Sequence, residues 1–126
     1  MSKVLLVADA PWVRNQVAGA LSDSGTELRE VTDPRAAVDE VIDFDPDVII
    51  IDMQIGSMGG MAVARAVRDS AYETHLADVP LVLLLDRAAD AFIAKRASAH
   101  AWLTKPLTAQ DLRATLEQVQ GAGAIR

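Results

Sequence analysis

The chain alternates short apolar runs with longer segments whose apolar residues recur at helical spacing. Five of the short runs are predicted to be strands, because they are rich in leucine or β-branched residues and end at polar or turn-forming residues. Two of them are almost wholly apolar, which is typical of central strands covered by helices on both faces. The predicted strands are Lys3–Val7, Glu27–Val31, Val48–Ile51, Leu81–Leu85 and Ala101–Leu103.

A helix is predicted after each strand. Pro11 and Pro34 suit first helical turns, where an N–H has no partner within the helix, and Asp33 and Thr108 suit amino caps. The strict alternation of strands and helices predicts βαβ units, and hence an α/β fold with a doubly wound parallel sheet of five strands. The predicted helices are Pro11–Ser22, Pro34–Asp43, Met58–Ser70, Ala88–Ser98 and Thr108–Gln120.

The composition fits a single globular domain. The 126 residues are 51% hydrophobic, which is enough for one substantial core and leaves no room for a second. We expect the domain to cover residues 1–120, with the glycine-rich residues 121–126 forming a short flexible tail. No output domain is therefore expected, and the module is predicted to stand alone.

Charge and hydropathy exclude several classes of function. A net charge of −6 argues against a nucleic-acid-binding surface, which is normally basic. The chain has no apolar run of about 18 residues that could cross a membrane, and it has no cysteine for disulfides or thiolate chemistry. We therefore expect a cytoplasmic protein that binds neither nucleic acid nor membranes.

Charged residues follow four of the predicted strands. Asp9, Asp52, Asp86 and Lys105 stand at or just after strand ends. Ligand sites of open parallel sheets lie beyond the carboxyl ends of the strands. Each residue alone would suit an ordinary loop acid or a simple ion pair. Their common edge favours a site in which Asp9, Asp52 and the backbone carbonyl of Gln54 hold Mg²⁺, and Asp52 accepts a phosphoryl group balanced by Lys105.

Four stretches of the sequence are similar to motifs of a known family: "KVLLVADA", "PDVIIIDMQIGSMGG", "VPLVLLLD" and "WLTKPL". Over Lys3 to Gln120 the chain resembles the receiver domain of a two-component response regulator. The resemblance implies a flavodoxin-like sheet of strand order 2-1-3-4-5, with Asp52 as phosphoacceptor and Lys105 as the phosphoryl contact. It also implies Mg²⁺ bound by Asp9, Asp52 and the Gln54 carbonyl, and a histidine kinase or phosphotransfer protein as partner.

Three positions depart from the family pattern. Ala8 replaces the first of two adjacent acids, so we expect weak Mg²⁺ binding. Leu85 replaces the threonine or serine that normally moves toward the phosphoryl group, so we expect an impaired switch. Gly56 stands where a proline is usual, which predicts a more flexible loop. Asp86, next to Leu85, adds negative charge near the phosphoryl site unless it points away.

Two tryptophans and one surface extend the functional prediction. Trp102 occupies the aromatic switch position, and beside Leu85 it is expected either to pack permanently or to be a plain core residue. Trp12 is a possible contact at the mouth of the site, although packing at the helix start is favoured. The face formed by the fourth helix, fifth strand and fifth helix is a possible surface for a homodimer or an unknown target protein.

These features predict a stand-alone, atypical receiver that is not an enzyme and acts through protein contact. The first alternative is a pseudo-receiver that signals by binding without phosphorylation. A small phosphatase-like protein would need an acid where Gln54 stands, and a flavodoxin-like cofactor binder would need Ser, Thr and Gly in "ADAPWV". Both remain as second alternatives.

Overall fold

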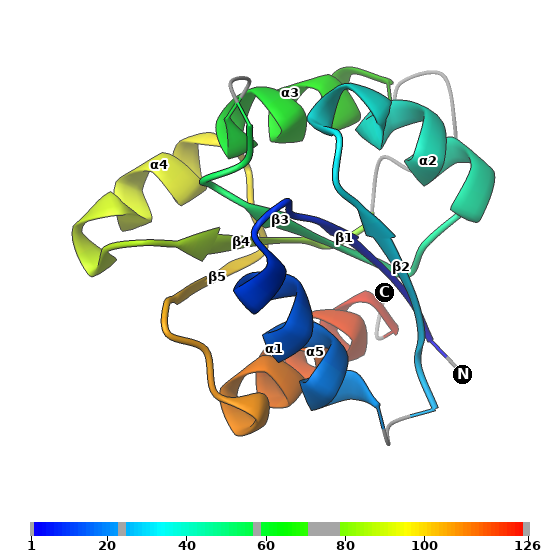
Figure 1. The fold of residues 1–126 in the computed structure, drawn as a ribbon, viewed down its shortest axis with the longest axis vertical. Coiled ribbons are helices and arrows are strands. Elements are labelled where there is room, and N and C mark those ends of the chain that lie inside the picture. Colours follow the sequence, from blue (N-terminus) through cyan, green and yellow to red (C-terminus); the bar gives the residue numbers. More distant parts are fainter. Residues whose placement is uncertain (1, 23–24, 57–58, 71–78, 125–126) are drawn as a thin grey trace.

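A computed structural model describes residues 2–22, 25–56, 59–70 and 79–124. It contains a five-stranded parallel sheet in the order β2-β1-β3-β4-β5 (Figure 1), which confirms the predicted fold class and strand order. The five predicted strands are all present, and two of them extend one residue beyond the predicted end. The strands are β1 (Lys3–Val7), β2 (Glu27–Val31), β3 (Val48–Asp52), β4 (Leu81–Leu85) and β5 (Ala101–Thr104).

Helices cover both faces of the sheet. In Figure 1, α1 and α5 lie on one face, and α2, α3 and α4 lie on the other. Short 3-10 turns, η1 and η4, precede α2 and α4. The bounds are α1 (Pro11–Leu21), η1 (Pro34–Ala36), α2 (Ala37–Phe44), α3 (Gly60–Ser70), η4 (Ala88–Asp90), α4 (Ala91–Arg96) and α5 (Ala109–Ala124).

Helix boundaries differ from the prediction more than strand boundaries do. The fourth helix ends at Arg96, because Ser98 adopts a positive φ of 60° that an α-helix cannot contain. The fifth continues past Gln120 to Ala124. The predicted start of the third helix at Met58 lies outside the described residues. The division between domain and tail at residue 120 stays a prediction.

Both predicted amino caps are present. The Asp33 carboxylate accepts a hydrogen bond from the Arg35 backbone N–H at 3.0 Å, and this bond holds the pKa of Asp33 below its usual value. The Thr108 hydroxyl accepts one from the Asp111 N–H at 3.0 Å. Each cap satisfies a backbone donor that has no partner inside its helix.

Alternate residues of the strands build two separate apolar cores. Leu5, Ile51 and Leu83 belong to the core that also contains residues of α2, α3 and α4, whereas Leu6 and Leu84 belong to the core shared with α1 and α5. A shift of one residue in strand register would turn every side chain to the opposite face. Burial on both faces therefore fixes where each strand ends, and with it the positions of the polar residues that follow.

In the described part of the chain, no helix is both long and apolar enough to cross a bilayer.

Candidate functional site

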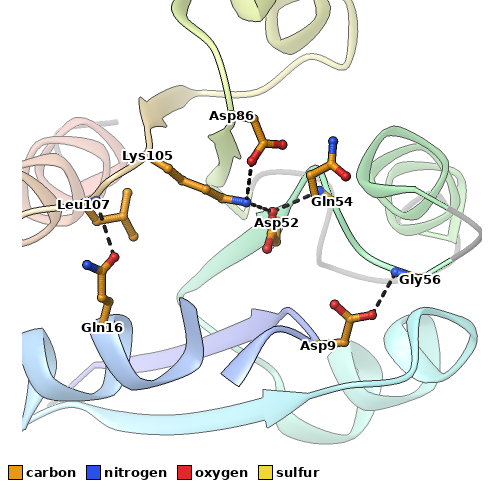
Figure 2. Close-up of polar contacts among 8 residues, drawn as sticks. All are labelled: Asp9, Gln16, Asp52, Gln54, Gly56, Asp86, Lys105 and Leu107. Atoms are coloured by element: carbon orange, nitrogen blue, oxygen red, sulfur yellow. Dashed lines mark hydrogen bonds and ion pairs between the residues drawn. The ribbon is translucent and has the colours of Figure 1, made fainter. Parts of the chain in front are cut away.

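Polar residues from three strand ends meet at the carboxyl edge of the sheet, as the topology predicts. Asp52 is the last residue of β3, Asp86 directly follows β4, and Lys105 directly follows β5. Figure 2 shows Lys105 reaching toward both acids, while Asp9, beyond β1, turns toward Gly56. The edge therefore brings one ammonium and two carboxylates into direct contact and leaves Asp9 on a neighbouring loop.

Asp52 is the only polar or charged residue among the described residues that is classed as buried, and its exposure is 0%. Its Oδ1 atom accepts hydrogen bonds from the Gln54 backbone N–H at 2.9 Å and from the Lys105 ammonium. Its Oδ2 atom is also buried but has no hydrogen-bond partner in the described part of the chain. A buried carboxylate oxygen without a partner is unfavourable, so a cation or an incoming polar group at Oδ2 would be stabilised.

Lys105 contacts both acids of the site, Asp52 and Asp86. Its side chain is only 6% exposed, and its Nζ atom contacts Asp52 and also lies 3.2 Å from Asp86 Oδ1. The same ammonium is 5.6 Å from the centre of the Trp12 ring, a cation–π distance. The Lys105 backbone N–H donates to the Leu85 carbonyl at 2.8 Å, and the Lys105-Pro106 peptide is cis. The position of the lysine is thus fixed at both its backbone and its charged end.

Asp9 is held by the loop that follows β3. Its Oδ2 atom accepts a hydrogen bond from the Gly56 backbone N–H at 2.9 Å. Gly56 has a positive φ of 50°, and a Cβ there would lie 3.2 Å from the Pro34 ring. Proline could not form this hydrogen bond, because it lacks the N–H. The prediction of a flexible loop is not tested, since it also concerns residues 57–58, which lie outside the described residues.

A close backbone approach explains the glycine at the start of α3. A Cβ on Gly60 would lie 2.6 Å from both the Asp52 carbonyl oxygen and the Met53 Cα atom, a separation that real Cβ atoms do not show. The Gly60 N–H also donates to the Met53 carbonyl at 3.1 Å. The first turn of α3 therefore packs directly on the backbone that carries Asp52.

Leu85, Trp102 and Ala8 are apolar residues that lie wholly or partly within the two cores. Leu85 is fully buried in the core that faces α2, α3 and α4, and Trp102 is partly buried and packs against that same core. Ala8 is fully buried in the opposite core, where its neighbours are other apolar residues. None of the three supplies a polar group to the site. The Lys95 ammonium lies 5.8 Å from the Trp102 ring.

The described residues contain no group of three or more His, Asp or Glu side chains placed to bind a metal. A hard cation can nevertheless be held by two carboxylates, a carbonyl and water. The unpartnered Oδ2 atom of Asp52 fits such a cation, because it is an oxygen ligand that nothing else in the described part satisfies. Asp9 and the backbone of Gln54 are the other candidates.

Sequence reasoning missed three contacts of this site. It placed Asp86 at the right edge but did not establish that the side chain turns toward Lys105, which it does. It favoured a packing role for Trp12, whereas this side chain is half exposed and lies beside the Lys105 ammonium. It gave no indication of the Gly56–Asp9 hydrogen bond. Of these three contacts, only that of Asp86 could have been expected from the sequence, because an acid directly follows the apolar run "LVLLL".

Comparisons with known proteins agree with this geometry. The family model described as "Response regulator receiver domain" matches residues 4–117. The chemotaxis protein CheY4 of Vibrio cholerae is 32% identical, with a TM-score of 0.81 over 94% of this chain and 98% of that one. The transcriptional regulatory protein TrcR of Mycobacterium tuberculosis is 29% identical over 116 residues, which are 90% of this chain and 43% of TrcR.

A third similar protein is the receiver domain of the sensor histidine kinase PA1611 of Pseudomonas aeruginosa, solved with a magnesium ion coordinated in its active-site cleft. It is 23% identical with a TM-score of 0.83 over 95% of this chain and 98% of that one, a likeness that shows the fold alone. The chain spans about half the length of the curated relatives that it matches.

Proposed function

The chain belongs to the response regulator receiver domain family, and we propose that it is an atypical member in which Asp52 accepts a phosphoryl group and the output is a contact with another protein. Receiver domains are signalling modules of two-component systems. Because the family is established, the phosphatase-like and flavodoxin-like proteins are no longer needed as alternatives. The proposal concerns this domain, whose curated relatives are about twice its length.

One observation carries the assignment of Asp52. It is a fully buried carboxylate with one oxygen bound to Lys105 and the other without a partner in the described part of the chain. An ordinary structural ion pair would satisfy both oxygens, because an unsatisfied buried acceptor costs about 1–3 kcal/mol. An oxygen left free beside a bound ammonium instead suits a site that takes up a cation while the same carboxylate reacts.

The proposed reaction is phosphoryl transfer from a phosphohistidine of a histidine kinase or phosphotransfer protein. A carboxylate oxygen of Asp52 forms a bond to phosphorus, the bond between phosphorus and the imidazole nitrogen breaks, and the imidazole takes up a proton. The Lys105 ammonium lies where it can balance the charge on the phosphoryl oxygens, as a lysine commonly does for phosphate groups.

The residues present fit a divalent cation of the Mg²⁺ type. The Asp52 Oδ2 atom, the Asp9 carboxylate and the Gln54 carbonyl would hold it, and when bound it would offset the repulsion between the carboxylate and the phosphoryl group. Two features favour weak binding. Ala8 supplies no second acid, and Asp9 already accepts the Gly56 N–H, which a cation must compete with.

The atypical character of the receiver rests on β4. Leu85 is buried in an apolar core and has no hydroxyl to donate to a phosphoryl oxygen, so the usual hydroxyl-based coupling is absent. Trp102 is partly buried and packs against that core. The surface formed by α4, β5 and α5 is the proposed contact face for a second copy or a target protein, since β5 is an edge strand and Phe92 on α4 is 58% exposed.

A pseudo-receiver that binds partners without phosphorylation is the alternative with its own support. Asp9 is already hydrogen-bonded to Gly56, and Lys105 is already shared by Asp52 and Asp86. These contacts stabilise the site without metal or phosphate. A pseudo-receiver predicts no change in fluorescence with millimolar Mg²⁺ and no covalent modification by a phosphoryl donor.

Intact mass after incubation with acetyl phosphate and Mg²⁺ separates the two proposals. A phosphoacceptor gains about 80 Da, the mass of one phosphoryl group, and Asp52→Asn gains nothing. The matched control is Asp111→Asn, which removes an acid from the first turn of α5 and leaves the modification intact. Absence of the adduct from the unmodified sequence at high donor and metal concentration would refute phosphorylation and leave the pseudo-receiver.

A further inference from the structure

A second carboxylate contacts the ammonium that would serve the phosphoryl group. Asp86 Oδ1 lies 3.2 Å from Lys105 Nζ, and Figure 2 shows Asp86 approaching the ammonium from the side of β4. The two acids that share this lysine differ in burial. The Asp52 side chain has no exposed surface, whereas the Asp86 side chain is 37% exposed. Only Asp86 can turn into solvent without moving the strand that carries it.

Asp86 also begins the segment that leads from β4 into α4. Arg87 occupies the N-cap position of η4, and its guanidinium forms an ion pair with Asp90 at 3.0 Å. The Asp90 N–H donates to the Arg87 carbonyl at 3.0 Å. We call residues 86–90 the β4–η4 junction. These ties join Arg87 to Asp90 just before α4, and Asp86 is joined to them through the backbone, so we expect a change in its position to reach the start of α4.

The backbone near the Asp86–Lys105 ion pair is held by hydrogen bonds between strands, whereas the ion pair itself joins only side chains. The Lys105 N–H donates to the Leu85 carbonyl, and the Met53 N–H donates to the Leu84 carbonyl at 3.0 Å, so both strands that flank β4 hold its end. The contact between Asp86 and Lys105 joins a nearly buried lysine to a carboxylate that is partly exposed. It is therefore the part of this region that can change while the sheet stays intact.

A phosphoryl group on Asp52 would change that contact through charge. A phosphorylated side chain carries a charge of about −1.5 to −2 near neutral pH. The new oxygens would compete with the Asp86 carboxylate for one ammonium, and like charges at this separation repel each other. We expect Asp86, the acid that is partly exposed to water, to move away from Lys105.

We propose that Asp86 performs the coupling that Leu85 cannot: a phosphoryl group on Asp52 displaces the Asp86 carboxylate from Lys105 and so releases the β4–η4 junction. Asp86 is a positioning residue that acts through Lys105. In typical receivers a hydroxyl residue is drawn toward the phosphoryl group, whereas here a carboxylate is pushed away from it. The inference rests on the proposed role of Asp52 as phosphoacceptor.

Amide NMR spectra of the junction, recorded with and without beryllofluoride and Mg²⁺, test the displacement, and intact mass with acetyl phosphate is measured on the same samples. In the unmodified sequence we expect the amide signals of residues 86–90 to shift on addition of beryllofluoride. In Asp86→Asn these signals are already shifted before addition and change little afterwards. The rate of adduct formation rises roughly fivefold in this variant, because one screened negative charge near the incoming group is removed.

Two variants make the test specific. Asp90→Asn breaks the other ion pair of the junction without touching Lys105, and it should respond to beryllofluoride as the unmodified sequence does. Asp86→Glu restores the charge and should recover the response. An adduct that forms without any shift of residues 86–90, or an equal shift in Asp86→Asn, would overturn the role of Asp86 alone. No adduct in the unmodified sequence would refute the proposed function, and the inference with it.

Discussion

Two halves of the proposed site differ in the side chains that they supply. The acceptor half consists of Asp9, Asp52 and Lys105, which keep their polar groups and lie at the ends of β1, β3 and β5. The coupling half consists of Leu85 and Asp86 at the end of β4, with Trp102 on β5, and Leu85 supplies no hydroxyl. In the proposed function, accepting a charged group and transmitting its arrival therefore depend on residues of different strands.

The difference follows from what each half requires. The acceptor half needs carboxylates and an ammonium at fixed separations, and the burial of β3 and β4 on both faces supplies those separations. In a typical receiver the coupling half supplies a hydrogen-bond donor that can move, and a buried leucine offers none. Substitutions can therefore damage each half separately.

The largest expected effect comes from Gly60→Ala, which would place a methyl group against the backbone that carries Asp52. A Cβ would lie 2.6 Å from the Asp52 carbonyl oxygen, so we expect the free energy of unfolding to fall by about 3 kcal/mol. Urea denaturation measures it. Gly19→Ala is the matched control, because nothing lies within 4 Å of that position and a helix gains about 0.5–1 kcal/mol from alanine. Equal effects at the two glycines would contradict the close approach.

Leu85→Thr is expected to sharpen the contrast by giving the coupling half a hydroxyl. Loss of buried apolar volume and a hydroxyl without an assured partner should cost about 2 kcal/mol. At the same time the fluorescence change of Trp102 on adding beryllofluoride should increase, measured in a Trp12→Phe background. Leu85→Val removes volume without adding a hydroxyl and should leave the fluorescence change small. If valine and threonine behave alike, the missing hydroxyl is not the cause of the poor coupling.

Ala8→Asp would add a second acid next to Asp9, and because Ala8 is fully buried among apolar residues the variant should also be less stable. We expect the affinity for Mg²⁺ to rise about tenfold, the lower end of what supporting ligands contribute to metal sites. A titration followed by Trp12 fluorescence reports the change, because this ring lies beside Lys105. Ala8→Asn has a similar size without the charge and should bind Mg²⁺ as the unmodified sequence does. Equal affinities in both variants would show that a lost carboxylate does not weaken the site.

The smallest effect is expected at Asp33, which caps the turn whose Pro34 lies against Gly56. Its pKa is lowered in the folded state by the Arg35 N–H, so its contribution to stability is present above the unfolded value of about 3.9 and is lost as the pH falls through the lower, folded value. Asp33→Asn should therefore be slightly less stable than the unmodified sequence at pH 7 and equally stable near pH 2. Urea midpoints at the two pH values measure this. A deficit that persists at low pH would exclude the carboxylate charge as its source.

Much of the fold could be predicted from the sequence, because apolar runs such as "VIIID" and "LVLLL" fix buried strands and hence the edge where polar residues gather. The ends of the helices were harder to predict from the sequence. The end of the fourth helix depends on the left-handed conformation of Ser98, for which the sequence carries no strong signal.

The site was predictable only as far as strand ends determine it. The topology places Asp52 and Lys105 at one edge, and their contact follows from that. The free Oδ2 atom of Asp52, the ion pair of Asp86 and the hydrogen bond from Gly56 depend on side-chain rotation and loop dihedral angles. The close approach at Gly60 depends on how α3 sits on β3, a separation that no local pattern encodes.

The backbone of Gly56 also limits which residues can occupy this position. The proline usual at this position in the family requires a φ near −65°, whereas Gly56 has a φ of 50° and donates its N–H to Asp9. A proline at this position would reverse the sign of the backbone angle and leave Asp9 without its donor. The present backbone at position 56 and a proline therefore exclude each other, so the hold on Asp9 depends on the residue type of the loop and not only on the acid itself.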